Sequence, residues 1–149
     1  MPENPLQASS NGFLQVGELQ FAHASHGSEN NPAIVLIRGL GTQLIDWSPV
    51  FLTALADAGL RVITFDNRDA GASSKLSESY SLNDMAADVI GILDTLKINA
   101  AHIFGISLGG MIAQLIAVNF PERVNCLFSV MSSSGAPGLP TAAPEVREK

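Results

Sequence analysis

The sequence predicts an α/β domain, with a mostly parallel sheet, flanking helices and an antiparallel hairpin at its entry. Three features of its 149 residues support this fold class. Short apolar runs alternate with segments of helical period in the order strand, helix, strand, helix, strand, helix, strand. The apolar runs are continuous, which is typical of parallel strands buried on both faces. Two alternating segments around a tight turn precede the first run and predict the hairpin.

Each predicted element has its own signal. The predicted strands are the alternating or apolar runs at residues 13–16, 19–23, 33–37, 61–65, 101–105 and 126–131. The predicted helices follow three of the inner strands, at residues 49–59, 82–96 and 107–119. Ser48 can cap the first helix ahead of Pro49, and Ser81 with Asp84 forms a capping pair for the second. Pro121 ends the third helix because proline cannot continue the hydrogen-bond ladder.

The composition is that of a soluble globular protein. Apolar residues make up 46% and charged residues 15% of the chain, which excludes a disordered protein. A net charge of −6 with scattered basic residues argues against nucleic-acid binding. The start of the chain lacks a signal peptide, no apolar run approaches the roughly 20 residues of a membrane span, and the single cysteine, Cys126, has no partner for an intramolecular disulfide. We therefore expect a cytoplasmic protein without nucleic-acid or membrane partners.

Ser107 stands where a strand turns sharply into a helix. Residues 105–109, Gly-Ile-Ser-Leu-Gly, match the G-x-S-x-G pattern of a nucleophile elbow. Such a turn leaves no room for side chains at its glycines and holds the serine in a strained conformation that exposes its hydroxyl. The following helix aims N–H groups at the point where an oxyanion would develop. The pattern predicts a nucleophile, and the alternative is a serine that caps an ordinary helix.

Three loops follow inner strands, at residues 38–43, 66–73 and 105–109. Binding sites in open parallel sheets form at the carboxyl ends of the strands, so we expect these loops to be neighbours. Asp66 and Asp69 in the second loop raise the question of a metal site. No histidine or cysteine accompanies them, so we expect loop ion pairs and no metal.

These motifs together resemble the α/β-hydrolase fold family. The resemblance rests on the elbow at residues 105–110, on Gly-Leu-Gly at 39–41, and on residues 66–73, which are similar to the family's D-x-R-x-x-G-x-S segment. It covers residues 13–134 and resembles the N-terminal half of the fold, in the ester-hydrolase branch of aclacinomycin methylesterase-like proteins. It implies a serine hydrolase that cleaves carboxylic esters or related small acyl compounds through an acyl-enzyme, without a cofactor.

The resemblance also implies a role for each matching residue. Ser107 would be the nucleophile, the backbone N–H groups of Leu40 and Leu108 would form the oxyanion hole, and Gly105 and Gly109 would be the elbow glycines. The acid and histidine of the family lie downstream of the serine, and no histidine follows Ser107 here. We therefore expect this chain alone to be inactive. The alternative is a non-catalytic ligand-binding module or an inactive gene fragment of this fold.

None of the three histidines is expected to replace the missing base. His102 begins the strand that leads to Ser107, and four residues at roughly 3.3 Å each put it beyond hydrogen-bonding reach. His23 and His26 follow the entry hairpin, away from the inner strand. We expect all three to be surface or structural residues.

Arg38 departs from the family pattern, which often has a histidine at this position. We expect Arg38 to hold its loop through Asp66 or Asp69, and the alternative is a solvated arginine. Trp47, beside a helix start, is expected to pack in the interior.

The resemblance finally suggests how the chain is divided. We expect a flexible arm at residues 1–11, the N-terminal part of an α/β-hydrolase domain at 12–134, and a linker with the start of a cap at 135–149. The family inserts its lid at this place, so we expect a fold truncated where the cap begins. The strand at 126–131 would then be an open sheet edge, through which we expect self-association.

Overall fold

The computed structural model describes residues 10–139, which form a six-stranded sheet with three α-helices. The strands are β1 (Ser10–Val16), β2 (Leu19–His26), β3 (Ala33–Ile37), β4 (Arg61–Phe65), β5 (Ala101–Ile106) and β6 (Val124–Val130). The helices are α1 (Pro49–Asp57), α2 (Leu82–Thr95) and α3 (Leu108–Asn119), with 3₁₀ turns at Leu44–Asp46 and Pro121–Arg123. Over the described residues, no helix combines the length and apolarity needed to cross a membrane.

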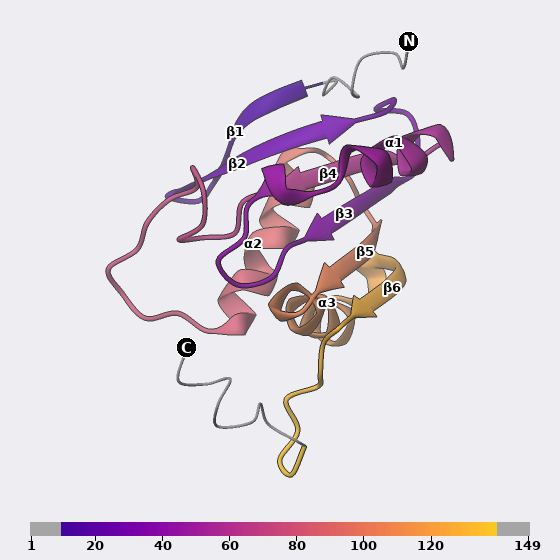
Figure 1. The fold of residues 1–149 in the computed structure, drawn as a ribbon. Helices are drawn as coiled ribbons and strands as arrows, with labels where there is room; N and C mark the ends of the chain where they lie inside the picture. Colours follow the sequence, from indigo (N-terminus) through magenta and orange to yellow (C-terminus); the bar gives the residue numbers. More distant parts are fainter. Residues whose placement is uncertain (1–9, 140–149) are drawn as a thin grey trace.

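The sheet confirms the predicted fold class. Its strand order is β1-β2-β4-β3-β5-β6 (Figure 1). β1 pairs with β2, and β2 with β4, in antiparallel fashion, whereas β3, β4, β5 and β6 pair in parallel. The carboxyl ends of the parallel strands therefore lie on the same side of the sheet, and the loops after β3, β4 and β5 meet there.

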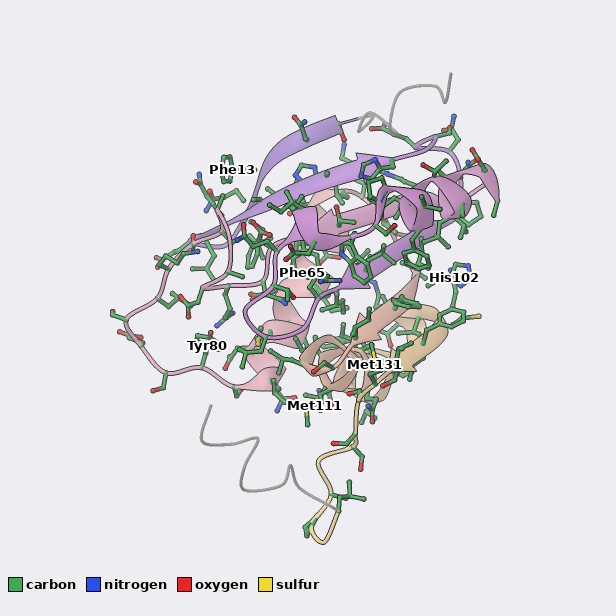
Figure 2. The ribbon with its side chains drawn as sticks, viewed as in Figure 1. Phe13, Phe65, Tyr80, His102, Met111 and Met131 are labelled. Atoms are coloured by element: carbon green, nitrogen blue, oxygen red, sulfur yellow. The ribbon has the colours of Figure 1, made fainter. Side chains whose placement is uncertain are left out.

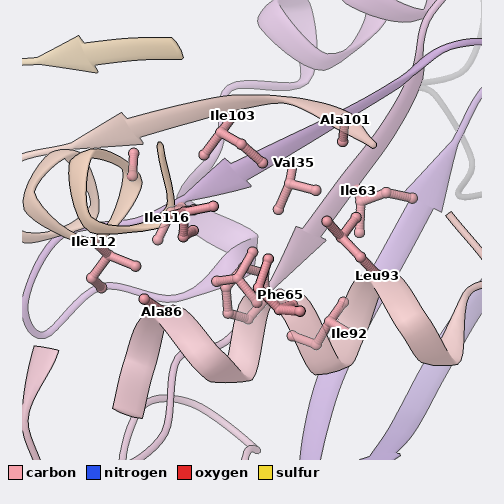
Figure 3. Packing of buried hydrophobic residues seen from close by; sticks show 14 of the residues in the cluster. Val35, Ile63, Phe65, Ala86, Ile92, Leu93, Ala101, Ile103, Ile112 and Ile116 are labelled. Carbon is pink, nitrogen blue, oxygen red and sulfur yellow. The ribbon is translucent and has the colours of Figure 1, made fainter. Parts of the chain in front are cut away.

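Helices cover both faces of the sheet (Figure 1). α1 packs on one face against β2 and β4, while α2 and α3 pack on the other against β1, β3, β5 and β6. Alternate residues of the inner strands divide between the two faces: Val35, Ile63 and Ile103 belong to the cluster under α2 and α3, whereas Ile34 and Val62 belong to the one under α1. Figure 3 shows the first cluster, in which Ile92, Leu93, Ile112 and Ile116 of the helices meet the strand residues. Because helices pack on both faces, the ends of the inner strands, from which the loops start, are held in fixed positions.

Several element boundaries differ from the sequence prediction. β1 begins at Ser10, inside the expected arm, and the rest of that arm lies outside the described residues. β2 continues to His26, because residues 23–26 pair with β4. β6 begins at Val124, two residues earlier than expected, and its pairing with β5 contains an irregularity at Ala101 and His102. The predicted cap beyond residue 139 also lies outside the described part of the chain.

The helix caps follow the sequence signals with one exception. Ser81 and Asp84 form the predicted capping box of α2. Ser48 is the N-cap residue of α1, but its side chain makes no capping hydrogen bond. Pro49 at the first helical position supplies the preset backbone angle with which α1 begins.

β6 lies at an edge of the sheet formed by the described residues. Residues 125–129 are all exposed, including Cys126 and the 46% exposed Phe128. On the face that α1 covers, between α1 and β6, the sheet has an apolar hollow of about 260 Å³. It is lined by Ile34, Phe51, Leu55, Leu60, His102, Phe104, Cys126 and Phe128. The predicted open edge is therefore present in this part of the chain, with an uncovered apolar surface beside it.

Two buried histidines lie in β2, within its antiparallel pairing with β4. His23 Nδ1 lies 3.1 Å from the carbonyl oxygen of Gly12, whereas His26 Nδ1 is buried without a hydrogen-bond partner among the described residues. Burial lowers the pKa of both imidazoles below the ordinary value of 6.5, because the charged form loses its hydration. Both side chains are therefore structural.

These histidines predict a loss of stability in acid. Their pKa values are lower in the folded chain than in the unfolded one, so the contribution to stability is present above pH 6.5 and is lost as the pH falls through the folded values. We expect the free energy of unfolding to decrease between pH 7.5 and 5, and less so in His26→Leu. Urea denaturation at both pH values measures the two decreases. Equal decreases in the variant and the parent chain would contradict the prediction.

Candidate active site

Ser107 occupies the turn between β5 and α3 in a conformation that side chains rarely adopt. Its φ is 55° and its ψ is −119°, and the residue is exposed. Its N–H donates to the carbonyl oxygen of Val130 at 3.0 Å. Its own carbonyl oxygen accepts from the N–H groups of Gly110 at 2.9 Å and Met111 at 3.3 Å, and from Ser132 Oγ at 2.7 Å. The backbone is thus held on both sides of the serine, and the hydroxyl is left accessible.

The glycines of the motif are required by close backbone contacts. A Cβ atom on Gly105 would overlap the carbonyl group of Gly109. A Cβ atom on Gly109 would overlap the carbonyl oxygen of Ile37 and lie 2.8 Å from that of Arg38. α3 therefore crosses the ends of β3 and β5 at a distance that only glycine permits.

The loop after β3 lies directly against Ser107. A Cβ atom on Gly39 would lie 3.3 Å from Ser107 Cβ and 3.8 Å from its Oγ. Leu40 follows, with 84% of its surface exposed. The N–H groups of Leu40 and Leu108 donate to no acceptor in the described part of the chain. The structure therefore brings both predicted backbone donors to the neighbourhood of the serine.

Two hollows meet at Leu40 and Leu108. The smaller, of about 350 Å³, is lined by Leu40, Ser107, Leu108, Met111, Met131, Ser132 and Ser133. The larger, of about 480 Å³, is lined by Gly39, Leu40, Gly41, Gln43, Asn67, Arg68, Asp69, Ala70, Gly71, Tyr80, Ser81, Leu82, Met85 and Leu108. Figure 2 shows Met111 and Met131 close to each other and Tyr80 farther along the same side of the molecule. Sequence reasoning missed Met131, whose φ of 47° no local pattern indicates.

Asp66 and Asp69 act through backbone hydrogen bonds, so the predicted loop ion pairs are wrong. Among the described residues neither carboxylate takes part in an ion pair. Asp66 accepts from the N–H groups of Leu44 at 2.6 Å and Ala72 at 2.9 Å. The pKa of Asp69 is lowered, first because the N–H of Leu76 donates to its carboxylate and second because of the Tyr80 hydroxyl.

Arg68 forms the ion pair of this region with a residue of α2. Its Nε and one terminal nitrogen each lie 2.7 Å from an oxygen of Asp88, and its guanidinium lies 4.9 Å from the centre of the Tyr80 ring. Burial raises the pKa of Asp88, and the pairing with Arg68 opposes this shift. Sequence reasoning missed this pair, because the partners lie 20 residues apart.

Arg38 stacks on an aromatic ring, which corrects the predicted contact with Asp66 or Asp69. Its guanidinium carbon lies 4.7 Å from the ring centre of Trp47. Trp47 is buried as predicted and packs against Phe51 and Phe104, at centroid distances of 5.9 and 6.0 Å. Arg38 Nε and Trp47 Nε1 are both buried and lack a hydrogen-bond partner among the described residues. Cation–π stacking on Trp47 holds Arg38 at the start of the loop that follows β3.

No histidine of the described residues lies on the loops around Ser107. His23 and His26 belong to β2, which β4 and β3 separate from β5. His102 pairs with Ile34 near the start of β5, whereas Ser107 follows the other end of the same strand. Within residues 10–139, no group of three or more His, Cys, Asp or Glu side chains could hold a metal ion.

These features define a class of protein: an α/β sheet protein with an exposed, strained serine at a strand-to-helix elbow. The model of the alpha/beta hydrolase fold family matches residues 32–149, and the chain belongs to that family. Rhodomycin D methylesterase DauP of Streptomyces sp. (strain C5) is 37% identical over 101 residues, which are 66% of this chain and 34% of that protein. The 3-oxoadipate enol-lactonase 2 of Acinetobacter baylyi is 36% identical over 112 residues, 75% of this chain and 41% of the relative.

The fold similarity covers more of the chain than these alignments do. A hydrolase from Pseudomonas aeruginosa PA01 superposes with a TM-score of 0.80 at 30% identity, over 95% of this chain and 51% of that structure. The chain thus spans about half of this structure, and between 34% and 41% of the two curated relatives. All three similar proteins are hydrolases by name.

The close contacts of the elbow predict a large effect of one added methyl group. Gly109→Ala is expected to lower the free energy of unfolding by about 3 kcal/mol, because backbone atoms cannot move aside as a flexible side chain can. Gly17→Ala is the matched control: its φ is 57° and its surroundings are open, so about 1 kcal/mol is expected. Urea denaturation compares the two. Similar losses in both variants would show that crowding at Gly109 is unimportant.

Proposed function

We propose that Ser107 is the nucleophile of a serine hydrolase that cleaves carboxylic esters or related acyl compounds through an acyl-enzyme. The observation that carries this proposal is the exposed Ser107 in its strained conformation, at the start of α3. A serine held in this way cannot relax toward the helix, and its hydroxyl faces a hollow that a substrate could enter. In this proposal the strained conformation exposes the Ser107 hydroxyl oxygen for attack on the substrate.

The backbone donors of Leu40 and Leu108 would form the oxyanion hole. Both N–H groups lack acceptors in the described part of the chain, and Leu108 opens α3, so the positive end of the helix lies at the same point. An acyl substrate attacked by Ser107 develops negative charge on its carbonyl oxygen. Donors that are already in place stabilise this charge without reorganisation, and removal of one such donor typically costs about 10²–10³ in rate.

The activity belongs to a longer protein in this proposal. Ser107 needs a base to take its proton, and none of the histidines at positions 23, 26 and 102 lies near it. The similar hydrolases are two to three times as long as the part matched here. A serine without its histidine keeps the oxyanion hole and the pocket but loses most of its rate acceleration. The acid and histidine would come from the remainder of such a fold, and this chain alone would be nearly inactive.

The larger hollow supports a small-molecule substrate. Its volume of about 480 Å³ lies within the range of ligand pockets, and its lining surface is mainly apolar, with several polar side chains among the lining residues. One relative is named a methylesterase and another an enol-lactonase, and both reactions cleave a carboxylic ester bond. We infer that this hollow receives one side of an ester whose carbonyl carbon lies at Ser107.

A fluorophosphonate probe tests the nucleophile directly. We expect slow labelling of the chain at Ser107, complete loss of labelling in Ser107→Ala, and unchanged labelling in Ser134→Ala, which alters an exposed serine outside both hollows. Intact mass and peptide mapping locate the label. A chain that is folded but not labelled at Ser107 would refute the proposal.

Ser107-dependent turnover of a short-chain chromogenic ester would exclude the alternative reading, a non-catalytic binding module. The module is favoured by the larger hollow, because Ser107 is not among its lining residues. Near-background turnover by this chain agrees with a missing base. Ser107-dependent turnover at an enzyme-like rate would exclude the binding module and would also exclude our inference that the base is absent.

The exposed edge further supports self-association of this chain. Among residues 10–139, β6 pairs with β5 alone, so the backbone groups on its outer side have no strand partner there, and Cys126 and Phe128 also line the apolar hollow of 260 Å³. A second copy can satisfy the backbone groups by strand pairing, and the pairing would also cover the apolar hollow beside β6 in each copy. We propose that the isolated chain associates through β6.

A lysine on the edge strand is expected to suppress this association. In Phe128→Lys, a charge would have to be buried to pair the strands, so the weight-average mass should fall toward that of the monomer. Phe13→Lys is the control, because Phe13 is 59% exposed on β1 at the opposite edge. Sedimentation velocity at micromolar concentration measures both, with reductant present because Cys126 is exposed. A monomeric parent chain would contradict the proposal.

A further inference from the structure

The loop that carries Leu40 is held at both ends by two consecutive residues. At its start, Asn67 Nδ2 donates to the carbonyl oxygen of Arg38 at 3.2 Å. At its end, the N–H of Leu44 donates to Asp66 Oδ1 at 2.6 Å. Both side chains follow β4, the neighbour of β3 in the sheet, and they are buried, with 3% of Asp66 and 5% of Asn67 exposed.

Asp66 is itself held by hydrogen bonds from the loop that follows it. Its Oδ2 accepts from the N–H of Ala72 at 2.9 Å, and its carbonyl oxygen accepts from Ser73 Oγ at 2.6 Å. Ser73 Oγ in turn accepts from the N–H of Ala22 in β2 at 3.0 Å, which ties the loop to the sheet. Gly71, with a φ of 45°, lies so close that any Cβ atom there would overlap the carboxylate of Asp66. The Asp66 carboxylate is therefore held at both oxygens, by the N–H of Leu44 at Oδ1 and by the N–H of Ala72 at Oδ2.

The loop between these two anchors contains two glycines, which restrict the backbone less than other residues do. Gly39 and Gly41 lie on either side of Leu40, Gly41 has a φ of 71°, and the side chain of Leu40 is mostly exposed. The side-chain contact inside the loop is the hydrogen bond from Thr42 Oγ1 to the carbonyl oxygen of Gly39, at 2.8 Å. The direction of the Leu40 N–H thus depends on where the two ends of the loop are held.

We propose that Asp66 and Asn67 are positioning residues, which hold the Leu40 N–H in place beside Ser107. The two hydrogen bonds from Asn67 to Arg38 and from Leu44 to Asp66 are called the brace below. The proposal rests on the proposed function, because it assigns the brace to the support of the oxyanion hole of that reaction. An oxyanion donor is effective when its direction is set before the reaction, so a mobile donor loses part of its advantage. The anchors act on the transition state through Leu40, and neither has to touch the reacting atoms.

Two changes at Asn67 test the brace. Asn67→Asp keeps the shape and removes the donor to Arg38, and Asn67→Ser removes it without adding a charge. Asn119→Asp is the matched control, because it removes the donor of a hydrogen bond with Asn83 that involves neither loop. Hydrogen exchange of the amides at 39–44 is measured together with the rate at which a fluorophosphonate labels Ser107. Unchanged exchange in β3 and β5 verifies that each variant is folded.

Both Asn67 variants should show two effects that the control lacks. Exchange at residues 39–44 should become about tenfold faster, which is the size expected for the loss of one buried hydrogen bond. Labelling of Ser107 should become about tenfold slower, less than the 10²–10³ for outright loss of an oxyanion donor. A merely structural role would alter the exchange of the sheet and leave the labelling of folded molecules unchanged.

The outcomes distinguish the brace from the function on which it rests. Unchanged exchange at 39–44 in both folded variants would overturn the brace itself. Faster exchange with labelling at the parent rate would overturn its role in positioning Leu40. If the parent chain is not labelled at Ser107, the proposed function fails, and the positioning role fails with it, while the exchange result still decides whether Asn67 holds the loop.

Discussion

The close crossing of α3 over the ends of β3 and β5 is the constraint on which the rest of the site depends. Gly105 and Gly109 permit it, because a Cβ atom at either position would overlap backbone atoms. Since the chain must turn within one residue, Ser107 takes the strained conformation and α3 begins immediately afterwards. The same crossing brings the start of α3 against the loop after β3. Strain, exposure of the hydroxyl and proximity of the two backbone donors therefore have a single origin.

The packing of the sheet compensates for this local strain. The inner strands are buried between α1 on one face and α2 with α3 on the other, so the strand ends are rigid platforms. Polar contacts then connect the loops to these platforms: Asp66 and Asn67 hold the loop after β3, and Arg68 holds the loop after β4 to Asp88 of α2. A strained serine is stable only when its surroundings are determined in this way by many other contacts.

Within the described residues, a well-organised turn at Ser107 is combined with an open edge of the sheet. β6 presents exposed apolar residues at an edge of the described sheet, and the three histidines lie away from Ser107. The similar hydrolases are considerably longer, and their names describe cleavage of ester bonds. In our proposal the part seen here supplies attack and oxyanion stabilisation, whereas proton transfer depends on residues outside it.

Local signals were sufficient for much of this protein. Continuous apolar runs predicted the parallel strands, Ser81 and Asp84 predicted the start of α2, and the spacing of Gly105, Ser107 and Gly109 predicted the elbow, because each pattern is satisfied within a few residues. Contacts between distant segments could not be predicted in this way. Arg38 stacks on Trp47 and not on Asp66, and Arg68 pairs with Asp88. β2 continues to His26 because its last residues pair with β4. The sequence by itself determined the fold class and the candidate nucleophile. Only the tertiary structure decided which side chains hold the loops, because partners 9 to 40 residues away compete for each polar group and packing selects among them.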